Sequence, residues 1–307
     1  MIYWGINALN HGSSIAVFNR NLVQYDFFPT DTIDVPYGHP DRIFWYERPW
    51  TKKARQIYAG QYKTAFDMNV LPSAYLKTIG MDKIPVTYTP HHASHAAAGY
   101  YTSPFNHCAI VVLDAIGEWD CASIWEGKHG KITKVWSKKY PNSLGLFYSA
   151  FTKLVGLEPI KQEFLLQQMA NQGDASRYYF DVHKYVGTTL DNFDNMHRGI
   201  YDWPHPINNL QDQCDIAASV QQIFEQQVDN VMKLACSLTG ADSLVYMGGC
   251  AMNSAANKKV VEPKFEYIWS LPQPGDPSSA IGAVLYHTKQ REWNWQWDTV
   301  KHIEIKV

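Results

Sequence analysis

The chain has 307 residues, of which 46% are hydrophobic and 18% charged, and its formal net charge is -2. This length suits one large domain or two closely packed lobes, and the ordinary composition excludes an intrinsically disordered chain. The charge offers no basic footprint of the kind that binds bulk nucleic acid, although a small local basic patch is compatible with it.

No targeting or membrane segment is evident. The first residues, MIYWGINALNHGSS, lack the basic region and long apolar run of a signal peptide. No stretch approaches the roughly 18 uncharged apolar residues of a membrane helix. The 5 cysteines are widely spaced, form no CxxC pair, and favour a reducing compartment over a disulfide framework or a structural zinc ribbon. We therefore expect a cytoplasmic protein without a membrane span.

The first third of the chain predicts β-structure. Residues 2–8 predict a strand, and residues 14–18 and 22–27 predict a hairpin around the turn at 19–21. Residues 31–60 are rich in proline, aspartate and aromatic residues and predict a long, surface-exposed excursion. Its basic residues are candidates for substrate specificity, or simply for a solvated charged loop: Arg42, Arg48, Lys52, Lys53 and Arg55.

A histidine-rich helix follows. Thr89 and Pro90 have the residue types of an N-cap and a first helical position. The small residues after them would let this helix lie close to a sheet. Residues 108–114 (CAIVVLD) predict a buried strand, and a second strand is predicted at 122–125.

The second half alternates helices and strands, which predicts an α/β fold. The predicted elements are a helix at 213–239 closed by Gly240, a strand at 243–247 ending in Gly248 and Gly249, a helix from Asn253, a strand at 265–269 and a helix from Ala280. No internal repeat is visible.

One pattern points to a metal. His91 and His95 are four residues apart, so on a helix both side chains project from one face and can hold the same ion. His92 replaces the glutamate that a zinc protease needs, which excludes that chemistry. Asp114 and Asp276 follow strands, where α/β folds gather ligands. Taken singly, these residues also fit solvated helix-start histidines and ordinary turn acids.

Two glycine-containing loops are candidates for anion binding. Gly248 and Gly249 end a strand and open a helix, where backbone N–H groups and a positive helix end approach an anion. The loop at residues 10–14 (NHGSS) can cradle a phosphate in the same way. Each loop taken alone is more typical of a plain turn.

The motifs in their order resemble a known family. GINALNHGSS, HHASHA, VVLDAIGE, SLGLFYSAFTKLVGLEP, MGGCAMNSAAN and PGDPSSAIGA are similar to successive motifs of the nodulation-factor and antibiotic O-carbamoyltransferases. The resemblance runs from about residue 2 to residue 288. It implies a two-lobed actin/sugar-kinase-like (ribonuclease H-like) α/β fold with the active site in the cleft between lobes. The first lobe would be 1–105, joined by the helix at 280–290, the second 106–279, and the tail 291–307.

The resemblance also implies a chemistry. A divalent metal would be held by four residues: His91, His95, Asp114 and Asp276. These ligand types suit iron(II), zinc and manganese about equally, and the family resemblance implies iron. The metal would grip the phosphate of a carbamoyl-adenylate derived from carbamoyl phosphate and ATP. His11 matches the histidine that deprotonates the hydroxyl of a small-molecule acceptor. The residues matching nucleotide-contacting positions are Gly12, Ser13, Gly248, Gly249 and Asn253.

Three departures from the family pattern stand out. The chain reaches Val307 without the family's second, YrdC-like domain, so we expect a separate YrdC-like, adenylate-forming protein to be the partner. The tail of this chain carries Trp293, Trp295 and Trp297. These residues either form a docking surface for that partner or pack on the chain's own body. Leu165 and Leu166 lie near the position where members of the family usually have a lysine. Ser278 and Ala115 occupy positions where glycine is common, which alters how closely the backbone can approach a ligand.

Other functions remain open at this point. Transferases that make threonylcarbamoyl-adenosine in tRNA are single-domain chains of this size, but they carry a glutamate between the paired histidines, where this chain has His92, Ala93 and Ser94. A non-catalytic, nucleotide-binding subunit of a carbamoylation complex is a second alternative. A sugar kinase of the same superfamily has no use for the histidine pair.

Overall fold

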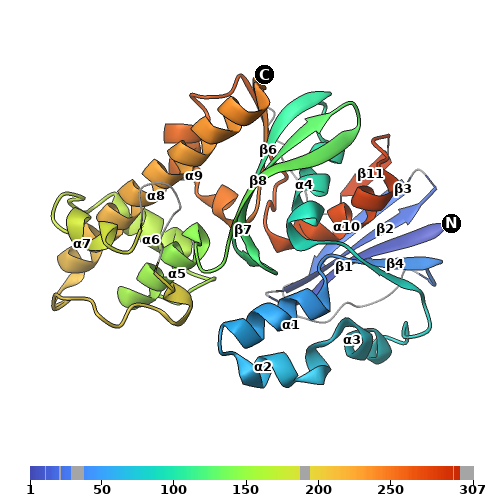
Figure 1. Ribbon diagram of the computed structural model, residues 1–307, viewed down its shortest axis with the longest axis horizontal. Helices are drawn as coiled ribbons and strands as arrows, with labels where there is room; N and C mark the ends of the chain where they lie inside the picture. Colours follow the sequence, from blue (N-terminus) through green and yellow to red (C-terminus); the bar gives the residue numbers. More distant parts are fainter. Residues whose placement is uncertain (11, 21, 29–37, 187–193, 293, 298–307) are drawn as a thin grey trace.

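A computed structural model describes residues 1–10, 12–20, 22–28, 38–186, 194–292 and 294–297. It is an α/β structure with two mixed sheets, each flanked by helices, as the two-lobed actin/sugar-kinase-like fold requires (Figure 1). The fold class expected from the motifs is confirmed. The finer lobe boundaries expected above stay a prediction.

The first sheet has 6 strands in the order β11-β3-β2-β1-β4-β5. The central strand β1 pairs antiparallel with β2 and parallel with β4, so the sheet is mixed. Its strands are β1 (Ile2–Asn10), β2 (Gly12–Asn19), β3 (Leu22–Phe28), β4 (Arg42–Trp45), β5 (Val86–Tyr88) and β11 (Asn294–Trp297).

The second sheet has 5 strands in the order β10-β9-β6-β7-β8. Here β6 pairs antiparallel with β7 and parallel with β9. Its strands are β6 (His107–Gly117), β7 (Asp120–Lys128), β8 (Lys131–Lys139), β9 (Ser243–Met247) and β10 (Tyr267–Trp269).

The two sheets share one topology. In each, three antiparallel strands run consecutively (β1 to β3, and β6 to β8), and two further strands add in parallel beside the first (β4 and β5, and β9 and β10). The duplication is structural and leaves no trace in the sequence, because an alternating apolar pattern satisfies either sheet with different residues. The strands β1 and β6 therefore occupy equivalent central places in the two lobes.

Helices fill the space between the sheets and cover their outer faces. α10 packs on β1, α4 packs on β6 and β9, and the two helices pack on each other, so they separate the sheets as two middle layers (Figure 1). The helices and short turns are α1 (Pro49–Tyr58), α2 (Tyr62–Phe66), η1 (Met68–Val70), α3 (Pro72–Thr78), α4 (His91–Thr102), α5 (Leu144–Leu154), α6 (Glu163–Ala170), α7 (Tyr179–His183), η2 (Met196–Arg198), α8 (Leu210–Thr239), η3 (Gly249–Met252), α9 (Ser254–Ala256), η4 (Asn257–Val261), η5 (Asp276–Ser278) and α10 (Ser279–Thr288).

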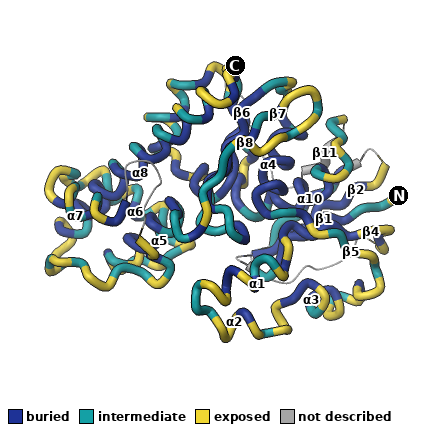
Figure 2. Tube along the Cα trace, viewed as in Figure 1, coloured by how far each residue is buried: buried dark blue, intermediate teal, exposed yellow. Residues whose placement is uncertain are grey.

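The alternation of side chains along β6 divides the apolar core in two. Ile110 and Val112 face the layer of α4 and α10 and join the core of the first sheet. Val111 and Leu113 face the opposite way, towards α5 and α8. Both faces of β6 are buried, which explains its nearly continuous apolar sequence (Figure 2).

Close helix packing depends on two glycines at this centre. A Cβ atom on Gly282 of α10 would overlap the main-chain carbonyl of Ser94 in α4. A Cβ atom on Gly5 of β1 would likewise overlap the carbonyl of Ala280. Glycine here lets α10 lie against both α4 and β1, which brings the two lobes to one helix layer.

Several local predictions need correction. The segment 31–60 is not one surface excursion, because β4 lies inside the first sheet with Phe44 and Trp45 buried, and α1 follows it. The part at 29–37 lies outside the described residues. Pro90, not Thr89, is the N-cap of α4, and the Thr89 hydroxyl donates instead to the carbonyl of Ala283 in α10.

Other predictions are confirmed. The strand at 243–247 and the helix ending at Gly240, in left-handed conformation, are observed as expected. In the tail, β11 pairs in parallel with β3, so this part of the tail lies on the chain's own sheet rather than projecting as a free strand. Trp293 and residues 298–307 lie outside the described residues. Among those described, no helix is both long and apolar enough to cross a membrane.

Candidate metal centre

The first turn and a half of α4 supplies two histidines to one buried point. The side chains of His91 and His95 are 1% and 0% exposed, and their Nε2 atoms lie 3.1 Å apart. The four-residue spacing predicted from the sequence thus places both imidazoles on one helix face. The third histidine, His92, turns away, and its Nδ1 lies 2.7 Å from the Ser123 hydroxyl on β7.

Asp114 reaches the same point from β6. The pairing of β6 with β7 shifts register between Leu113 and Gly117, so Asp114 sits at an irregularity near the end of the ladder. Its Oδ1 accepts hydrogen bonds from the backbone N–H groups of Ala115 (2.8 Å) and Gly249 (3.4 Å). Its Oδ2 is thereby directed to the histidines, 3.1 Å from His91 Nε2 and 3.6 Å from His95 Nε2.

Asp276 completes the cluster from the loop after β10. It begins the short turn η5, directly before α10, and its Oδ1 lies 3.2 Å from His91 Nε2 and 3.4 Å from His95 Nε2. The Ser14 hydroxyl of β2 donates to the carbonyl of Pro277 at 2.6 Å and so ties this loop to the first sheet. The site is therefore built from α4, β6 and η5 and is braced by β2.

The geometry of these four side chains fits a metal ion. One donor atom from each of His91, His95, Asp114 and Asp276 lies within 4.8 Å of every other. The five donor–donor distances given above run from 3.1 to 3.6 Å. Donors bound at about 2.1 Å are about 3.4 Å apart in a tetrahedron and about 3.0 Å apart at adjacent octahedral positions. Two imidazole nitrogens and two carboxylate oxygens suit iron(II), zinc or manganese.

The charges around this point reinforce one another. Burial lowers the pKa of His91, but the carboxylates of Asp276 and Asp114 outweigh it and leave that pKa well above its ordinary value. Burial raises the pKa of Asp114, yet the two histidines hold it well below its usual range, and the pKa of Asp276 is lowered in the same way. Both carboxylates are thus ionised donors.

Two buried glutamates surround His91. Glu47, after β4, directs Oε2 towards His91 Nδ1 at 3.8 Å, and its Oε1 accepts a hydrogen bond from Lys52 at 2.7 Å. Glu118 accepts the backbone N–H of His91 at 3.3 Å and holds the Arg48 guanidinium through both carboxylate oxygens. Sequence reasoning missed both glutamates, because the pairing of β4 with β1 and the β6–β7 turn bring them in from distant positions. Glu118 is the last residue of the VVLDAIGE motif, and Glu47 directly precedes Arg48 in the segment 31–60, but neither position by itself indicates a role at the cluster.

The glycine segment after β9 lies against the same cluster. Gly248 has φ of +93°, and a Cβ atom there would overlap the carbonyl of Leu113. Gly249 donates its N–H to Asp114, as described above. Asn253 points inward instead: it caps α9 through Ala256 N–H and exchanges two amide hydrogen bonds with Gln221. Gly248 and Gly249 are therefore at the cluster, whereas the Asn253 side chain is engaged inside the protein.

The remaining predicted positions divide as follows. His11 lies outside the described residues. Gly12 begins β2 with φ of +90°, and Ser13 is fully buried next to Ser14, which contacts the Asp276 loop. Among the departures from the family pattern, Leu166 is buried in the core beside α8, and the Ser278 hydroxyl donates to the carbonyl of Gly275.

Fold and site together define a class of protein: a two-lobed, actin/sugar-kinase-like α/β structure with a two-histidine, two-carboxylate cluster between its sheets. The family model described as "Carbamoyltransferase N-terminus" matches residues 44–285, so the chain belongs to this carbamoyltransferase family. The match includes all four cluster residues and confirms the family resemblance of the motifs.

Individual relatives agree with this assignment. An uncharacterised protein of Synechocystis sp. is 28% identical over 92% of this chain and 56% of its own length. Nodulation protein NolNO of Sinorhizobium fredii is 24% identical over 67% of the chain and 32% of that protein. Nodulation protein NolO of Bradyrhizobium diazoefficiens is 26% identical over 64% of the chain and 37% of that protein. The chain spans about half the length, or less, of these relatives.

Proposed function

We propose that this chain transfers a carbamoyl group from carbamoyl-adenylate to a hydroxyl of a small-molecule acceptor, with a divalent metal bound at the cluster. The observation that carries the proposal is the convergence of His91, His95, Asp114 and Asp276 within 4.8 Å, in a chain of the carbamoyltransferase family. The same residues have no role in a sugar kinase.

The chain's own residues suit this chemistry. A bound divalent cation supplies positive charge that can neutralise and orient a phosphate. Gly248 packs against the carbonyl of Leu113 and Gly249 donates its N–H to Asp114, and this backbone, without Cβ atoms, is our candidate for contacting a phosphate group. Asp114 is held for metal binding through the two N–H groups on its Oδ1.

The acceptor requires a base. His11 is our candidate, because it matches the family's base in the NHGSS motif and a histidine titrates near neutral pH. Ser14, three residues after His11, donates to the carbonyl of Pro277, so the strand β2 that follows His11 is tied to the loop that carries Asp276. We propose iron(II) as the metal, with zinc or manganese as alternatives by ligand type.

The carbamoyl donor is part of the proposal. We propose that a separate YrdC-like protein makes carbamoyl-adenylate from carbamoyl phosphate and ATP and supplies it to this chain. The partner and the acceptor are both inferred from the family. The test is therefore to offer preformed carbamoyl-adenylate and a panel of neutral sugars, sugar acids and sugar phosphates to the chain, and to look for a mass increase of one carbamoyl group.

Variants give this test its controls. His95→Ala should lose most of the bound metal and all of the transfer, while His107→Ala, in a half-exposed pair with Glu126, should keep both. His11→Ala should keep the metal and lose about 10²–10⁴-fold in turnover, as expected for a general base. Full transfer by His95→Ala in the presence of a chelator would refute the metal-assisted function.

A further inference from the structure

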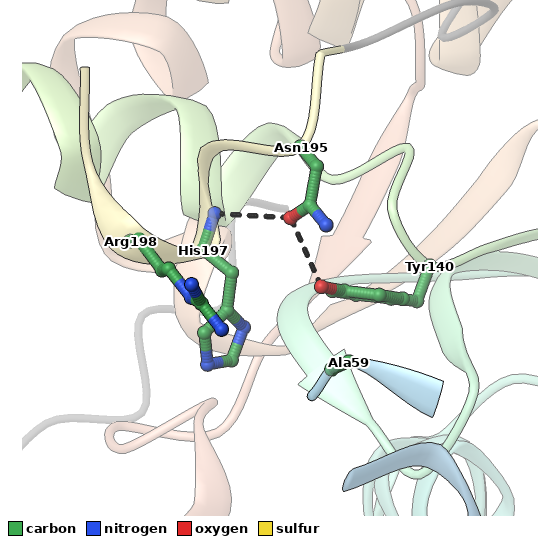
Figure 3. A pocket seen from close by; sticks show the side chains of 5 residues that line it. All are labelled: Ala59, Tyr140, Asn195, His197 and Arg198. Atoms are coloured by element: carbon green, nitrogen blue, oxygen red, sulfur yellow. Dashed lines mark hydrogen bonds between the residues drawn. The ribbon is translucent and has the colours of Figure 1, made fainter. Parts of the chain in front are cut away.

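A hollow of about 230 Å³ lies where the two lobes face each other. None of the four cluster residues lines it. Three segments distant in sequence line it: the end of α1 at Ala59, Tyr140 after β8, and the turn η2 with the preceding Asn195 (Figure 3). The Tyr140 hydroxyl donates to Asn195 Oδ1 at 2.9 Å, which joins two of these walls. The remaining lining residues are His197 and Arg198.

The hollow lies next to a buried cation that forms no ion pair within the described residues. Arg55, one helical turn before Ala59, is 6% exposed. Its Nε donates to the main-chain carbonyl of Glu118 at 3.2 Å and its Nη1 to Gln61 Oε1 at 2.8 Å. Both acceptors are neutral, and within the described ranges no carboxylate forms an ion pair with Arg55. The Glu47 carboxylate acts on Arg55 only through space, without an ion pair. A buried charge without a paired counter-charge is costly, and an anion bound nearby would lower that cost.

A second cation and a hydrogen-bond donor belong to η2. The side chain of Arg198 makes no hydrogen bond or ion pair with any residue that the structure describes, and it is exposed in the wall of the hollow. Because Gln61 Oε1 accepts from Arg55, its Nε2 donates to His197 Nε2 at 2.6 Å. A neutral His197 then carries its proton on Nδ1, which is buried and has no partner among the described residues.

The electrostatics of His197 agree with this picture. Burial, followed by the positive charges of Arg55 and Arg198, lowers the pKa of the His197 imidazole. Both guanidinium groups therefore act on the same ring, and the ring itself stays neutral as a donor. Two guanidinium groups beside a vacant volume are the arrangement that binds a carboxylate or a phosphate.

The position of the hollow separates it from the nucleotide segment. In the second sheet, Gly248 and Gly249 follow β9 on one side of β6, whereas Tyr140 follows β8, two strands away on the other side. The hollow connects to the cluster through Glu118, whose carbonyl accepts from Arg55 and whose carboxylate accepts from the His91 backbone. In the strand order of the second sheet, Tyr140 of the hollow and the glycine segment therefore lie on opposite sides of β6.

We infer that this hollow binds an anionic group, a carboxylate or a phosphate, carried by the hydroxyl acceptor, with Arg198 and Arg55 supplying the charge. The assignment to the acceptor rests on the function proposed above. Anion binding itself does not, and it is measured without turnover.

The experiment titrates inorganic phosphate and, separately, acetate into the chain after metal removal with a chelator, and follows binding by calorimetry. Arg198→Ala should weaken binding of at least one of these anions about ten- to hundredfold, as expected for loss of a charged hydrogen-bond partner. Arg198→Lys should retain part of the affinity. Arg20→Asn, which removes an exposed arginine at φ of +54° from the distant β2–β3 turn, should bind like the parent chain.

Two further arms locate the anion. The anion should still bind to His95→Ala, because the hollow does not include the cluster. If His95→Ala lost binding and Arg198→Ala kept it, the anion would bind at the cluster. That result would overturn the inference and leave the proposed function intact. ATP affinity should be the same in Arg198→Ala and the parent chain. An equal weakening of ATP and phosphate would assign the hollow to the nucleotide and overturn the acceptor assignment.

Discussion

The two oxygens of Asp114 have different partners, and these partners fix the orientation of its carboxylate in the cluster. Oδ1 accepts two backbone N–H groups, and Oδ2 faces the two histidines. The side chain therefore has one orientation before any ion binds. His91 is fixed from the other side, where its backbone N–H donates to Glu118 and its Nδ1 faces Glu47. Such outer partners orient metal ligands and tune their affinity.

The first prediction concerns Glu47 as a positioning residue. Glu47→Gln keeps the shape but removes the charge that faces His91 Nδ1 at 3.8 Å. We expect metal affinity to fall about 10–100-fold, the usual effect of losing such a partner. Competition with a chelator of known affinity measures it. The matched control is Glu126→Gln, because Glu126 faces His107 outside the cluster, and this variant should leave metal affinity unchanged. Equal metal affinity in Glu47→Gln and the parent chain would contradict the positioning role of Glu47.

At this scale the sequence predicted the donors but not their surroundings. His91 and His95 could be found because helical periodicity is local, and four residues always place two side chains on one face. Asp114 and Asp276 could be named as strand-end acids, but only the resemblance joined them to the histidines. Glu47 could not be found, because it reaches His91 through the pairing of β4 with β1, which no local pattern encodes.

At the scale of elements, the site depends on how closely α10 lies on α4. These two helices form the layer between the sheets. α4 carries both histidines, and α10 begins at Ser279, three residues after Asp276. The contact is made through Gly282, where any Cβ atom would meet the carbonyl of Ser94, one residue before His95. The distance between α4 and α10 therefore sets the distance between the two histidines and Asp276.

The second prediction follows from this contact. Gly282→Ala should destabilise the protein by about 3 kcal/mol, because the partner atom is backbone and cannot move without shifting α4. It should also lower metal content, since the histidine pair moves relative to Asp276. Denaturant unfolding and metal analysis on the same samples measure the two effects.

The control for this variant is a second glycine. Gly240→Ala, at the end of α8, has φ of +60° and nothing within 4 Å of the new Cβ, so it should cost only about 1 kcal/mol of backbone strain. Its metal content should equal that of the parent chain. If both variants lost stability equally and Gly282→Ala kept its metal, the helix contact would not control the site.

The sequence predicted long elements better than short ones. The helix α8 is observed over Leu210–Thr239 because its apolar positions recur with helical period and Gly240 ends it. The prediction for the segment 31–60 is wrong, because its prolines and charges suggest a loop. Its short run of Ile43, Phe44 and Trp45 forms a strand through pairing with neighbouring strands. Strand β5, of 3 residues, is defined by its neighbour alone.

At the scale of the whole molecule, the duplicated strand order explains where the site lies. β1 and β6 are equivalent central strands, and the hairpin that follows each one is directed to the same region: Ser14 of β2 contacts the Asp276 loop, and Glu118 after β6 contacts His91. Of the two expected lobes, 1–105 supplies the histidines and 106–279 supplies the carboxylates. This duplication could be predicted only through the family resemblance, because its two halves share a topology and no visible sequence repeat.

The third prediction uses this position between the lobes. A metal that binds the native cluster and not the unfolded chain stabilises the fold by RT ln(1 + [L]/Kd), about 2.7 kcal/mol at a free concentration of 100 Kd. For a protein of this size, each kcal/mol shifts Tm by about 2–4 °C, so removing the metal should lower Tm by about 5–10 °C. His95→Ala should unfold at the same temperature with and without chelator, because its cluster has already lost a donor. His107→Ala should respond to the chelator as the parent chain does, since His107 pairs with Glu126 away from the cluster. A chelator shift of equal size in His95→Ala and the parent chain would mean that the stabilising ion binds elsewhere, and the four-residue cluster would no longer be the metal site.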